Sequence, residues 1–385
     1  MALRANRRAL TAAARAAVGT ATPFYAFDPR AARDNARVWK REAAESDVFE
    51  VFYPYKCNRC SCVIELFARE SLGAEVSTGP DLDSALALGI RGERLVVSGP
   101  AKTRRMLDHA IGSGAWLVAD GERDAAAILE RSRALGRRPR YLVRLRVAAA
   151  EPSQADFGFG AAEAVRLARA LIHDRRPLPE GIAFHLGTGL EADAPYLGAL
   201  RETASLSAAL RSAGVPVRVV DVGGGFAARG EARRDSLGRP RRPPRSVPAR
   251  VRELSRALRA AVPGARGFLE PGRALVSDAF HLVTRVVRVR GSRVYLDASR
   301  MSHAFFVPRG RHPFIAVPRR AGSRRRSIAG PLPSHLDLFS EGEAVGKPRE
   351  GDILVIGSVG AYNLIQASAW AGPVPEVVEV GRRRR

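Results

Sequence analysis

The stretch VRVVDVGGG, residues 217–225, contains the pattern from which the fold can be predicted. A short, β-branched apolar run passes directly into three glycines. A run of this kind, bounded by a turn and followed by a segment of helical spacing, is typical of a buried parallel strand. Similar runs recur along the chain at residues 51–56, 74–78, 94–98, 115–120, 141–147, 181–187, 217–223 and 267–270.

The segments between these eight runs carry apolar residues at spacings of three and four, as at Ala125, Ile128 and Leu129, which predicts amphipathic helices. Strands that alternate with helices pair in parallel through right-handed crossovers. Eight such units in about 220 residues have the size of a TIM (β/α)8 barrel. A doubly wound open sheet is the competing arrangement, but no Gly-x-Gly-x-x-Gly follows the first strand.

The alternation of strand-like and helix-like segments ends after residue 273. Two apolar runs separated by Gly291 and Ser292 predict a β-hairpin. The strand-like runs of this part are residues 280–290, 293–297, 314–317, 352–356 and 374–380, and the first expected helix is 361–370. The run 23–28 is also strand-like and is expected to pair with this sheet. We therefore predict an N-terminal helix and strand (1–28) that join a C-terminal, mainly β domain with a basic tail (274–385), and a barrel (29–273).

Composition excludes some classes of protein. Apolar residues make up 46% of the 385 residues, enough for a sizeable core, and no apolar run reaches the length of a membrane span. The formal net charge is +24, but the arginine clusters at 229–250, 319–326 and 382–385 have the character of loops and a tail. No motif of a nucleic-acid-binding module accompanies them, so nucleic acid is not the expected partner.

Three cysteines, Cys57, Cys60 and Cys62, lie too close together for the disulfide framework of a secreted protein. A cytoplasmic location is therefore expected. Their spacing also suits metal binding, but no fourth ligand follows nearby, so no metal site is predicted.

Polar residues and glycines stand where the predicted barrel strands end, which is where TIM barrels carry their functional groups. They are Lys56, Glu75, Ser77, Lys102, Arg144, His185, Thr188, Gly223, Gly224, Gly225, Glu270 and Arg273. Structural alternatives stay open for four of these features: Lys56 as a solvated strand end, the glycines as a flexible turn, His185 as a core histidine, and Glu270 as the partner of Arg273.

Four of these features suit the chemistry of a single cofactor. A lysine in a dry barrel mouth is a nucleophile for carbonyl groups, and three glycines let backbone N–H groups approach a phosphate. Glu270 suits a protonated ring nitrogen, and His185 suits the flat face of a ring. A Schiff-base lysine, a phosphate cradle, a carboxylate and an imidazole together match the needs of pyridoxal 5'-phosphate.

The ordered set of motifs resembles the fold-type III pyridoxal-phosphate decarboxylases, the group of ornithine, diaminopimelate and arginine decarboxylases. The resemblance runs from about residue 22 to residue 370 and is closest in pattern to diaminopimelate decarboxylase-like proteins. The matching segments are YKCN (55–58), EVS (75–77), PAK (100–102), FHLGT (184–188), DVGGGF (221–226), EPGR (270–273), GP (330–331) and GAY (360–362).

This resemblance implies a carboxy-lyase that acts as a homodimer, with active sites at the dimer interface. Lys56 would be the Schiff-base lysine, His185 would stack on the ring, and Glu270 would pair with the pyridine nitrogen. The residues implied to hold the phosphate and complete the cofactor site are Thr188, Gly223, Gly224, Gly225, Gly272, Arg273 and Tyr362.

The chain departs from the family in the loop GPLPSHLD, residues 330–337. Pro333 and Ser334 stand where the family usually has a cysteine and an acid, groups associated with reprotonation and with the substrate's distal amine. By a loose alignment, Phe306 stands near the arginine that meets a substrate carboxylate in diaminopimelate decarboxylases. We therefore expect a substrate other than plain diaminopimelate, with His335 or Lys56 delivering the proton.

The nearby Arg309 and Arg311 suggest a substrate with a neutral or anionic side chain, such as an amino-acid conjugate. Two alternatives stay open: another pyridoxal-phosphate reaction such as amino-acid racemisation, and a catalytically impaired regulatory homologue. Glu270 disfavours the first, because a strong electron sink is less suited to racemisation. Retention of the cofactor residues disfavours the second. The role of the segment 229–250 is also open.

Overall fold

The computed structural model describes Ala13 and residues 20–228, 245–303 and 312–380. The chain forms two compact units. Among the described residues, one unit comprises 36–227 and 245–272, and the other comprises 20–35, 228, 273–303 and 312–380 together with Ala13. Each unit has a sheet of its own.

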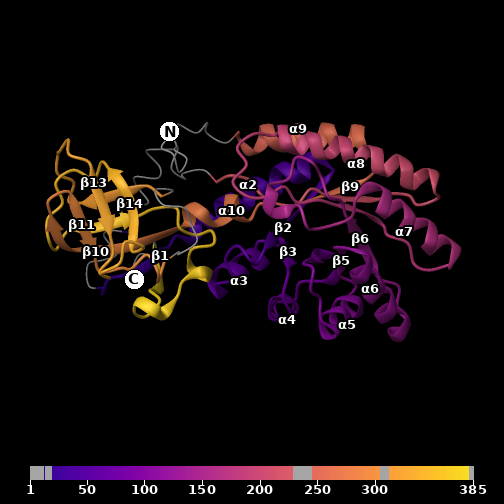
Figure 1. The fold of residues 1–385 in the computed structure, drawn as a ribbon, viewed down its shortest axis with the longest axis horizontal. Helices are drawn as coiled ribbons and strands as arrows, with labels where there is room; N and C mark the ends of the chain where they lie inside the picture. The colour runs from indigo at the N-terminus through magenta and orange to yellow at the C-terminus, as the bar shows by residue number, and fades with distance from the viewer. Residues whose placement is uncertain (1–12, 14–19, 229–244, 304–311, 381–385) are drawn as a thin grey trace. The chain divides into compact units, whose positions relative to one another are not determined.

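The first unit is a closed barrel of eight parallel strands, joined in the order β2 to β9 (Figure 1). The strands are β2 (Phe49–Pro54), β3 (Gly73–Val76), β4 (Leu95–Val97), β5 (Trp116–Ala119), β6 (Arg140–Arg144), β7 (Gly181–Ala183), β8 (Val219–Asp221) and β9 (Arg266–Leu269). Each strand overlaps one of the eight runs identified in the sequence, so the predicted TIM barrel is confirmed.

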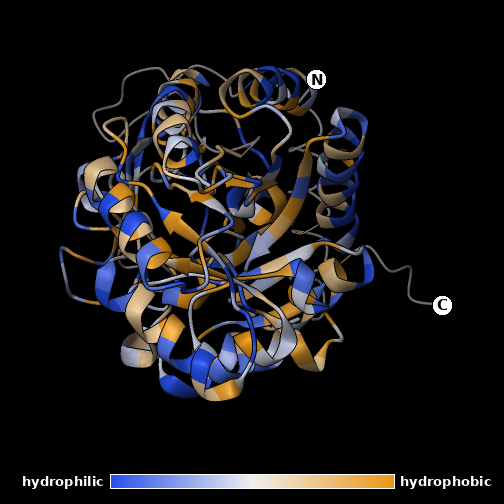
Figure 2. Ribbon diagram, turned by 90° about the vertical axis from the view of Figure 1, so that its right-hand side faces the viewer, coloured by the Kyte–Doolittle hydropathy of each residue, from blue (hydrophilic) through white to orange (hydrophobic). Residues whose placement is uncertain are grey.

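Aromatic residues fill the barrel core. The Phe268 ring lies 4.6 Å from Phe52 and 5.5 Å from Trp116, and all three side chains are buried. Burial of one such side chain contributes about 1.5–3 kcal/mol. Figure 2 shows the apolar strands in the middle, with helices around them whose outer faces are more polar. The packed interior leaves the strand ends as the place for polar chemistry.

A helix follows each barrel strand, and α2 precedes the first of them. The apolar residues of these helices recur at helical spacing and cover the outer face of the sheet. The helices are α2 (Pro29–Ser46), α3 (Ser61–Arg69), α4 (Gly79–Ala87), α5 (Arg104–Ser113), α6 (Glu122–Leu135), α7 (Ala161–His173), α8 (Ala194–Ser212) and α9 (Val247–Ala261), with the short α10 (Gly272–Val276) after β9.

The second unit is mainly β. Strand β10 (Phe280–Arg290) pairs with β11 (Arg293–Leu296), which confirms the hairpin at Gly291 and Ser292. Strand β1 (Phe24–Phe27) pairs with β10 and with β16 (Glu376–Glu379), as its sequence indicated. The remaining strands are β12 (Phe314–Val317), β13 (Arg326–Ala329), β14 (Leu338–Glu343) and β15 (Ile353–Ile356). The predicted mainly β architecture of this part is confirmed.

The prediction of a helix at residues 361–370 is wrong. Tyr362 has a φ of 68°, in the left-handed region, which an α-helix does not admit. The segment instead contains two short 3₁₀ turns, Leu364–Gln366 and Ala369–Ala371.

Several sequence predictions fall outside the described residues: the N-terminal helix (except Ala13), Phe306, Arg309, Arg311, the basic tail and residues 229–244. The last part of the arginine-rich segment is described, and two of its arginines are structural. Arg245 and the buried Arg250 bind the Asp193 carboxylate at 2.7 Å and 2.6 Å. Asp193 directly precedes α8, so this end of the segment anchors the loop after β7.

Candidate active site

Lys56 emerges where β2 leaves the barrel sheet. The Tyr55 N–H still donates to the Glu75 carbonyl (2.9 Å), and the chain then turns, with the Cys57 N–H donating to Pro54. The Lys56 side chain is 35% exposed, and its Nζ lies 2.8 Å from Glu75 Oε2. The turn thus presents an amine that a small molecule can reach.

Glu75 is fully buried at the end of β3 and accepts hydrogen bonds on Oε1 from Ser77 (3.0 Å) and Ser98. Burial pushes the pKa of Glu75 up, but the Lys56 ammonium and the two serines outweigh it, so the pKa lies below its usual value. Glu75 is therefore a carboxylate that holds the Lys56 side chain in place.

Lys102 contrasts with Lys56. Its side chain is fully buried, and its Nζ donates to the Gly99 and Val118 carbonyls and to Asp124 Oδ2 at 2.6–2.7 Å. All three ammonium hydrogens are thereby used, and the amine joins the ends of β4 and β5. The burial and the three hydrogen bonds of Lys102 indicate a structural role. The partly exposed side chain of Lys56 is not accounted for in this way.

His185 follows β7 and lies partly buried close to Lys56. Burial, the Lys56 ammonium and the Arg144 guanidinium lower the pKa of His185 to about 3. Its Nδ1 is 3.4 Å from the Gly224 N–H, which donates to it. The structure therefore holds a neutral, flat imidazole beside the glycine turn.

The three glycines bring the ends of β7, β8 and β9 together. Gly223 has a φ of 66°, and a Cβ on it would lie 2.5 Å from the Phe184 carbonyl oxygen. The Gly223 carbonyl accepts the Glu270 N–H at 3.0 Å. Only glycine suits both the conformation and the close approach, so the turn is a fixed part of the barrel mouth.

Asp221 and Glu270 form a buried carboxyl pair beside this turn. Burial raises the pKa of Asp221 to about 6, and it raises the pKa of Glu270 well above its usual value, with the Asp221 carboxylate adding to that shift. The two groups share a hydrogen bond. A carboxyl group held in this way becomes anionic readily only when a cation approaches it.

This pair makes stability depend on pH. Both folded pKa values lie above the unfolded ones, so the pair favours folding below about pH 4 and that contribution is lost as pH rises through about 6 and beyond. In the cofactor-free protein above pH 5, the free energy of unfolding should fall less steeply with pH in Glu270→Gln than in the unaltered protein. The difference in slope should be up to about 1.4 kcal/mol per pH unit for each proton involved. Urea titrations at several pH values measure this, and equal slopes in both proteins would contradict it.

The other residues expected at the site, Thr188, Gly272, Arg273 and Tyr362, each contact neighbours within their own unit. Thr188 is exposed on the loop after β7, and its N–H donates to Glu151 Oε1 at 3.3 Å. In the β unit, the Arg273 guanidinium lies 5.1 Å from the centre of the Tyr362 ring. Gly272, the neighbour of Arg273 in sequence, packs against Pro54, where a Cβ would lie 2.5 Å away.

The loop that carries Pro333, Ser334 and His335 is fixed by Asp337. This buried carboxylate accepts Ser299 Oγ (3.0 Å) and the Arg300 N–H (2.7 Å) on Oδ1, and the Leu332 N–H (2.9 Å) on Oδ2. His335 itself is exposed. The departures from the family's sequence thus lie on an ordered loop of the β unit.

The structure brings together Lys56, His185, Gly223–Gly225 and Glu270 within the barrel unit, and Arg273 with Tyr362 within the β unit. Sequence reasoning assigned no role to Glu75 or Asp221. A signal for both was present, since each is a carboxylate at the end of an apolar strand, where a buried charge requires a partner.

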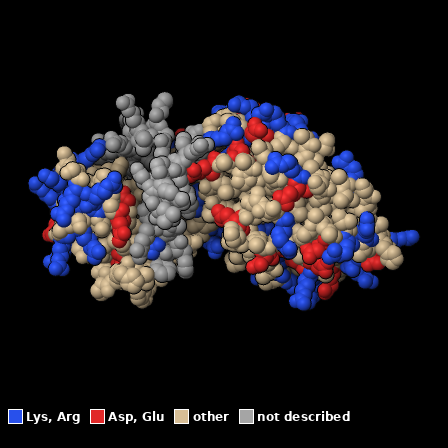
Figure 3. Space-filling view, turned by 45° about the horizontal axis from the view of Figure 1, so that its top comes forward, with Lys and Arg blue, Asp and Glu red and all other residues tan. Residues whose placement is uncertain are grey.

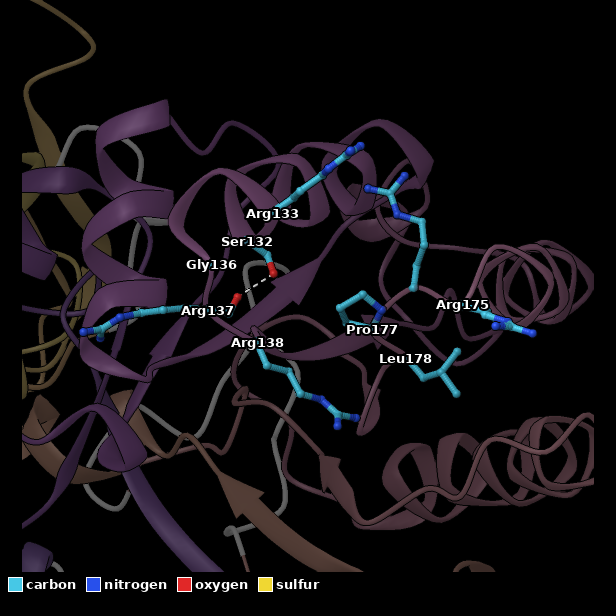
Figure 4. A pocket seen from close by; sticks show the side chains of 9 residues that line it. Ser132, Arg133, Gly136, Arg137, Arg138, Arg175, Pro177 and Leu178 are labelled. Carbon is cyan, nitrogen blue, oxygen red and sulfur yellow. Dashed lines mark hydrogen bonds between the residues drawn. The ribbon is translucent and has the colours of Figure 1, made fainter.

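A surface pocket of about 490 Å3 lies at the opposite ends of the barrel strands. It is formed by the segments that precede β6 and β7, and its lining includes Arg133, Arg137, Arg138 and Arg175, which Figure 4 labels, together with Arg176. None of the candidate site residues lines it. On the face shown in Figure 3, acidic side chains are interspersed among the basic ones of the barrel unit.

Two kinds of feature are absent from the described residues. No group of three or more histidine, cysteine, aspartate or glutamate side chains is placed to hold a metal ion. No helix there combines the length and the apolar character needed to cross a membrane.

Comparison with known proteins identifies relatives that match most of the chain. Residues 31–277 match the family described as pyridoxal-dependent decarboxylase, pyridoxal binding domain. A diaminopimelate decarboxylase of Zymomonas mobilis is 27% identical, over 93% of this chain and 87% of its own length. An ornithine decarboxylase of Caenorhabditis elegans is 24% identical, over 89% of this chain and 84% of its own length.

Solved structures agree on the fold. The crystal structure of diaminopimelate decarboxylase from M. jannaschii superimposes with a TM-score of 0.85, at 21% sequence identity. The match covers 96% of this chain and 89% of that one.

Proposed function

The chain belongs to the pyridoxal-dependent decarboxylases, whose pyridoxal-binding domain matches more than half of it, and from this membership we propose which residues perform its reaction. The protein is a carboxy-lyase that uses pyridoxal phosphate to decarboxylate an amino acid. When bound, the cofactor accepts the electron pair that departing CO2 leaves on the α-carbon.

Lys56 is the residue that attaches the cofactor covalently. The observation that carries this assignment is its partly exposed amine, held 2.8 Å from Glu75 and close to His185 at the barrel mouth. Glu75 orients the amine for its attachment to a carbonyl through this ion pair.

The carboxyl pair fits the cofactor's ring nitrogen. Glu270 is buried beside Asp221 with a raised pKa. A cationic pyridinium nearby would stabilise the ionised form of Glu270 over its protonated form. Glu270 in turn keeps that nitrogen protonated. His185 would hold the cofactor ring with its neutral imidazole, because an uncharged ring can lie in a dry site without an unpaired charge.

The phosphate of the cofactor would be held by backbone N–H groups and one guanidinium. We assign this role to Thr188, the glycine turn at 223–225, Gly272, Arg273 and Tyr362. The turn supports the assignment through its fixed glycine conformation, and Arg273 through its position over the Tyr362 ring. Proton return to the product carbon is assigned to Lys56 or His335.

For the substrate, we propose an amino acid or amino-acid conjugate other than plain diaminopimelate. Pro333 and Ser334 support this, because neither can supply the thiol or the carboxylate that stands at these positions in the family. We further propose a homodimer in the cytoplasm, with active sites completed at the dimer interface.

A panel of amino acids and conjugates, diaminopimelate included, tests this proposal. We expect CO2 from a substrate without a distal ammonium group, and a visible cofactor absorption band in the purified protein. CO2 from diaminopimelate as the best substrate would overturn the substrate assignment alone. Scrambled stereochemistry without CO2 would establish the racemase alternative, and a protein that stays colourless with added cofactor would contradict the whole assignment.

A further inference from the structure

Two thiols meet at the start of α3, and nothing in the decarboxylase reaction uses them. The Sγ atoms of Cys60 and Cys62 lie 2.9 Å apart and form a hydrogen bond. Both side chains are partly exposed, whereas Cys57 is buried. The pair is therefore accessible to a small reagent in the folded protein.

Local structure explains why the two sulfurs converge. Cys60 directly precedes α3 in an extended conformation, with φ −55° and ψ 133°, while Cys62 is already helical. The Cys60 N–H donates to Asn58 Oδ1 at 3.0 Å, and the Cys60 carbonyl accepts the Val63 and Ile64 N–H groups. These bonds hold the backbone so that both side chains lie over the first turn of the helix.

The environment favours the thiolate of Cys60. The hydrogen bond from the Cys62 thiol outweighs the opposing effect of burial and lowers the pKa of Cys60 to about 7. A substantial fraction is then ionised at neutral pH, and the thiolate is the form that attacks oxidants.

We propose that Cys60 and Cys62 form an oxidative modification site, at which a hydroperoxide oxidises Cys60 and Cys62 then closes an intrachain disulfide. In the first step the Cys60 thiolate attacks a peroxide oxygen, the O–O bond breaks and hydroxide (or alkoxide) leaves, which produces a sulfenic acid. In the second, the Cys62 sulfur attacks the sulfenic sulfur, the S–O bond breaks, and water leaves with the thiol proton. The two thiols together lose two electrons, which the peroxide gains.

The site lies next to the turn that carries Lys56. Asn58 links the two, because its carbonyl accepts Tyr53 Oη at 2.8 Å and its side chain accepts the Cys60 N–H. A disulfide requires the sulfurs to approach to about 2.05 Å, so the Cys60 and Cys62 side chains at the start of α3 must move. We therefore expect oxidation to change the absorption band of the bound cofactor, an effect that rests on the proposed role of Lys56.

Peroxide treatment of the folded, full-length protein tests the site directly. Alkylation of the remaining thiols, followed by peptide mass spectrometry, should show that Cys60 and Cys62 are joined, that Cys57 is still alkylated after unfolding, and that dithiothreitol reverses the change. Cys62→Ser should stop at a sulfenic acid that dimedone traps on Cys60. Cys60→Ser should slow oxidation about tenfold, because Cys60 is the thiol whose surroundings lower its pKa and favour the thiolate.

Cys57→Ser is the matched control and should form the disulfide like the unaltered chain. The proposal is overturned if both thiols survive peroxide in the native protein, if Cys57 is joined instead, or if Cys62→Ser yields no trapped sulfenic acid. These mass measurements do not depend on decarboxylation. A disulfide without a change in the cofactor band would overturn only the link to Lys56.

Discussion

Lys56→Ala is expected to lower kcat/KM for decarboxylation by about 10^4-fold or more, the loss typical of removing a nucleophile that acts as part of a catalytic group. The amine supplies the covalent attachment of the cofactor, and no neighbouring group replaces it: Lys102 has its three hydrogens bound within the barrel. Because Glu75 would lose its ion-pair partner at 2.8 Å, the variant should also be less stable.

Borohydride reduction of the protein with its cofactor measures the attachment independently of activity. The chain has four lysines, Lys40, Lys56, Lys102 and Lys347, so one labelled peptide identifies the residue. Lys347→Ala, at an exposed position, is the control and should retain both activity and label. A label on any lysine other than Lys56 would refute the assignment, whatever the activity of the variant.

The barrel was predictable because its strands are buried on both faces. A parallel strand under helices reads as a continuous apolar run, and each of the eight runs proved to contain or touch a strand. Strands β13 and β14 were missed for the opposite reason. The segments Arg326–Ala329 and Leu338–Glu343 mix charged, small and apolar residues, and they become strands through pairing with neighbours distant in sequence.

The sequence was sufficient to predict which strand ends carry the site residues. It was not sufficient to predict which of their side chains interact with one another. Strand ends in a barrel meet at one mouth, which places Lys56, His185 and Glu270 together. The pairing of Lys56 with Glu75, and the proton shared by Asp221 and Glu270, depend on side-chain direction and burial after the barrel closes. The positive φ of Tyr362, which prevents the helix expected at 361–370, has no signature in that sequence.

Glu270→Gln is expected to lower kcat by about 10^2- to 10^3-fold, the range found when a single group that stabilises transition-state charge is removed. The amide keeps the size of the side chain and a hydrogen bond to Asp221, but it cannot become an anion opposite the ring nitrogen. The nitrogen is then free to lose its proton, and the electron sink weakens. Cofactor attachment should persist, because Lys56 is unchanged.

The stability of the same variant separates a chemical role for Glu270 from a structural one. Glu270 carries a desolvation cost in the cofactor-free protein, and its raised pKa means that this cost grows with pH. Glu270→Gln should therefore be at least as stable as the unaltered protein near pH 8, although its turnover is far slower. Glu341→Gln, at an exposed position of β14, should change neither property. If Glu270→Gln instead lost activity and stability together near pH 8, with kcat restored wherever folding is restored, the carboxyl would be a structural element and its assignment to the ring nitrogen would fail.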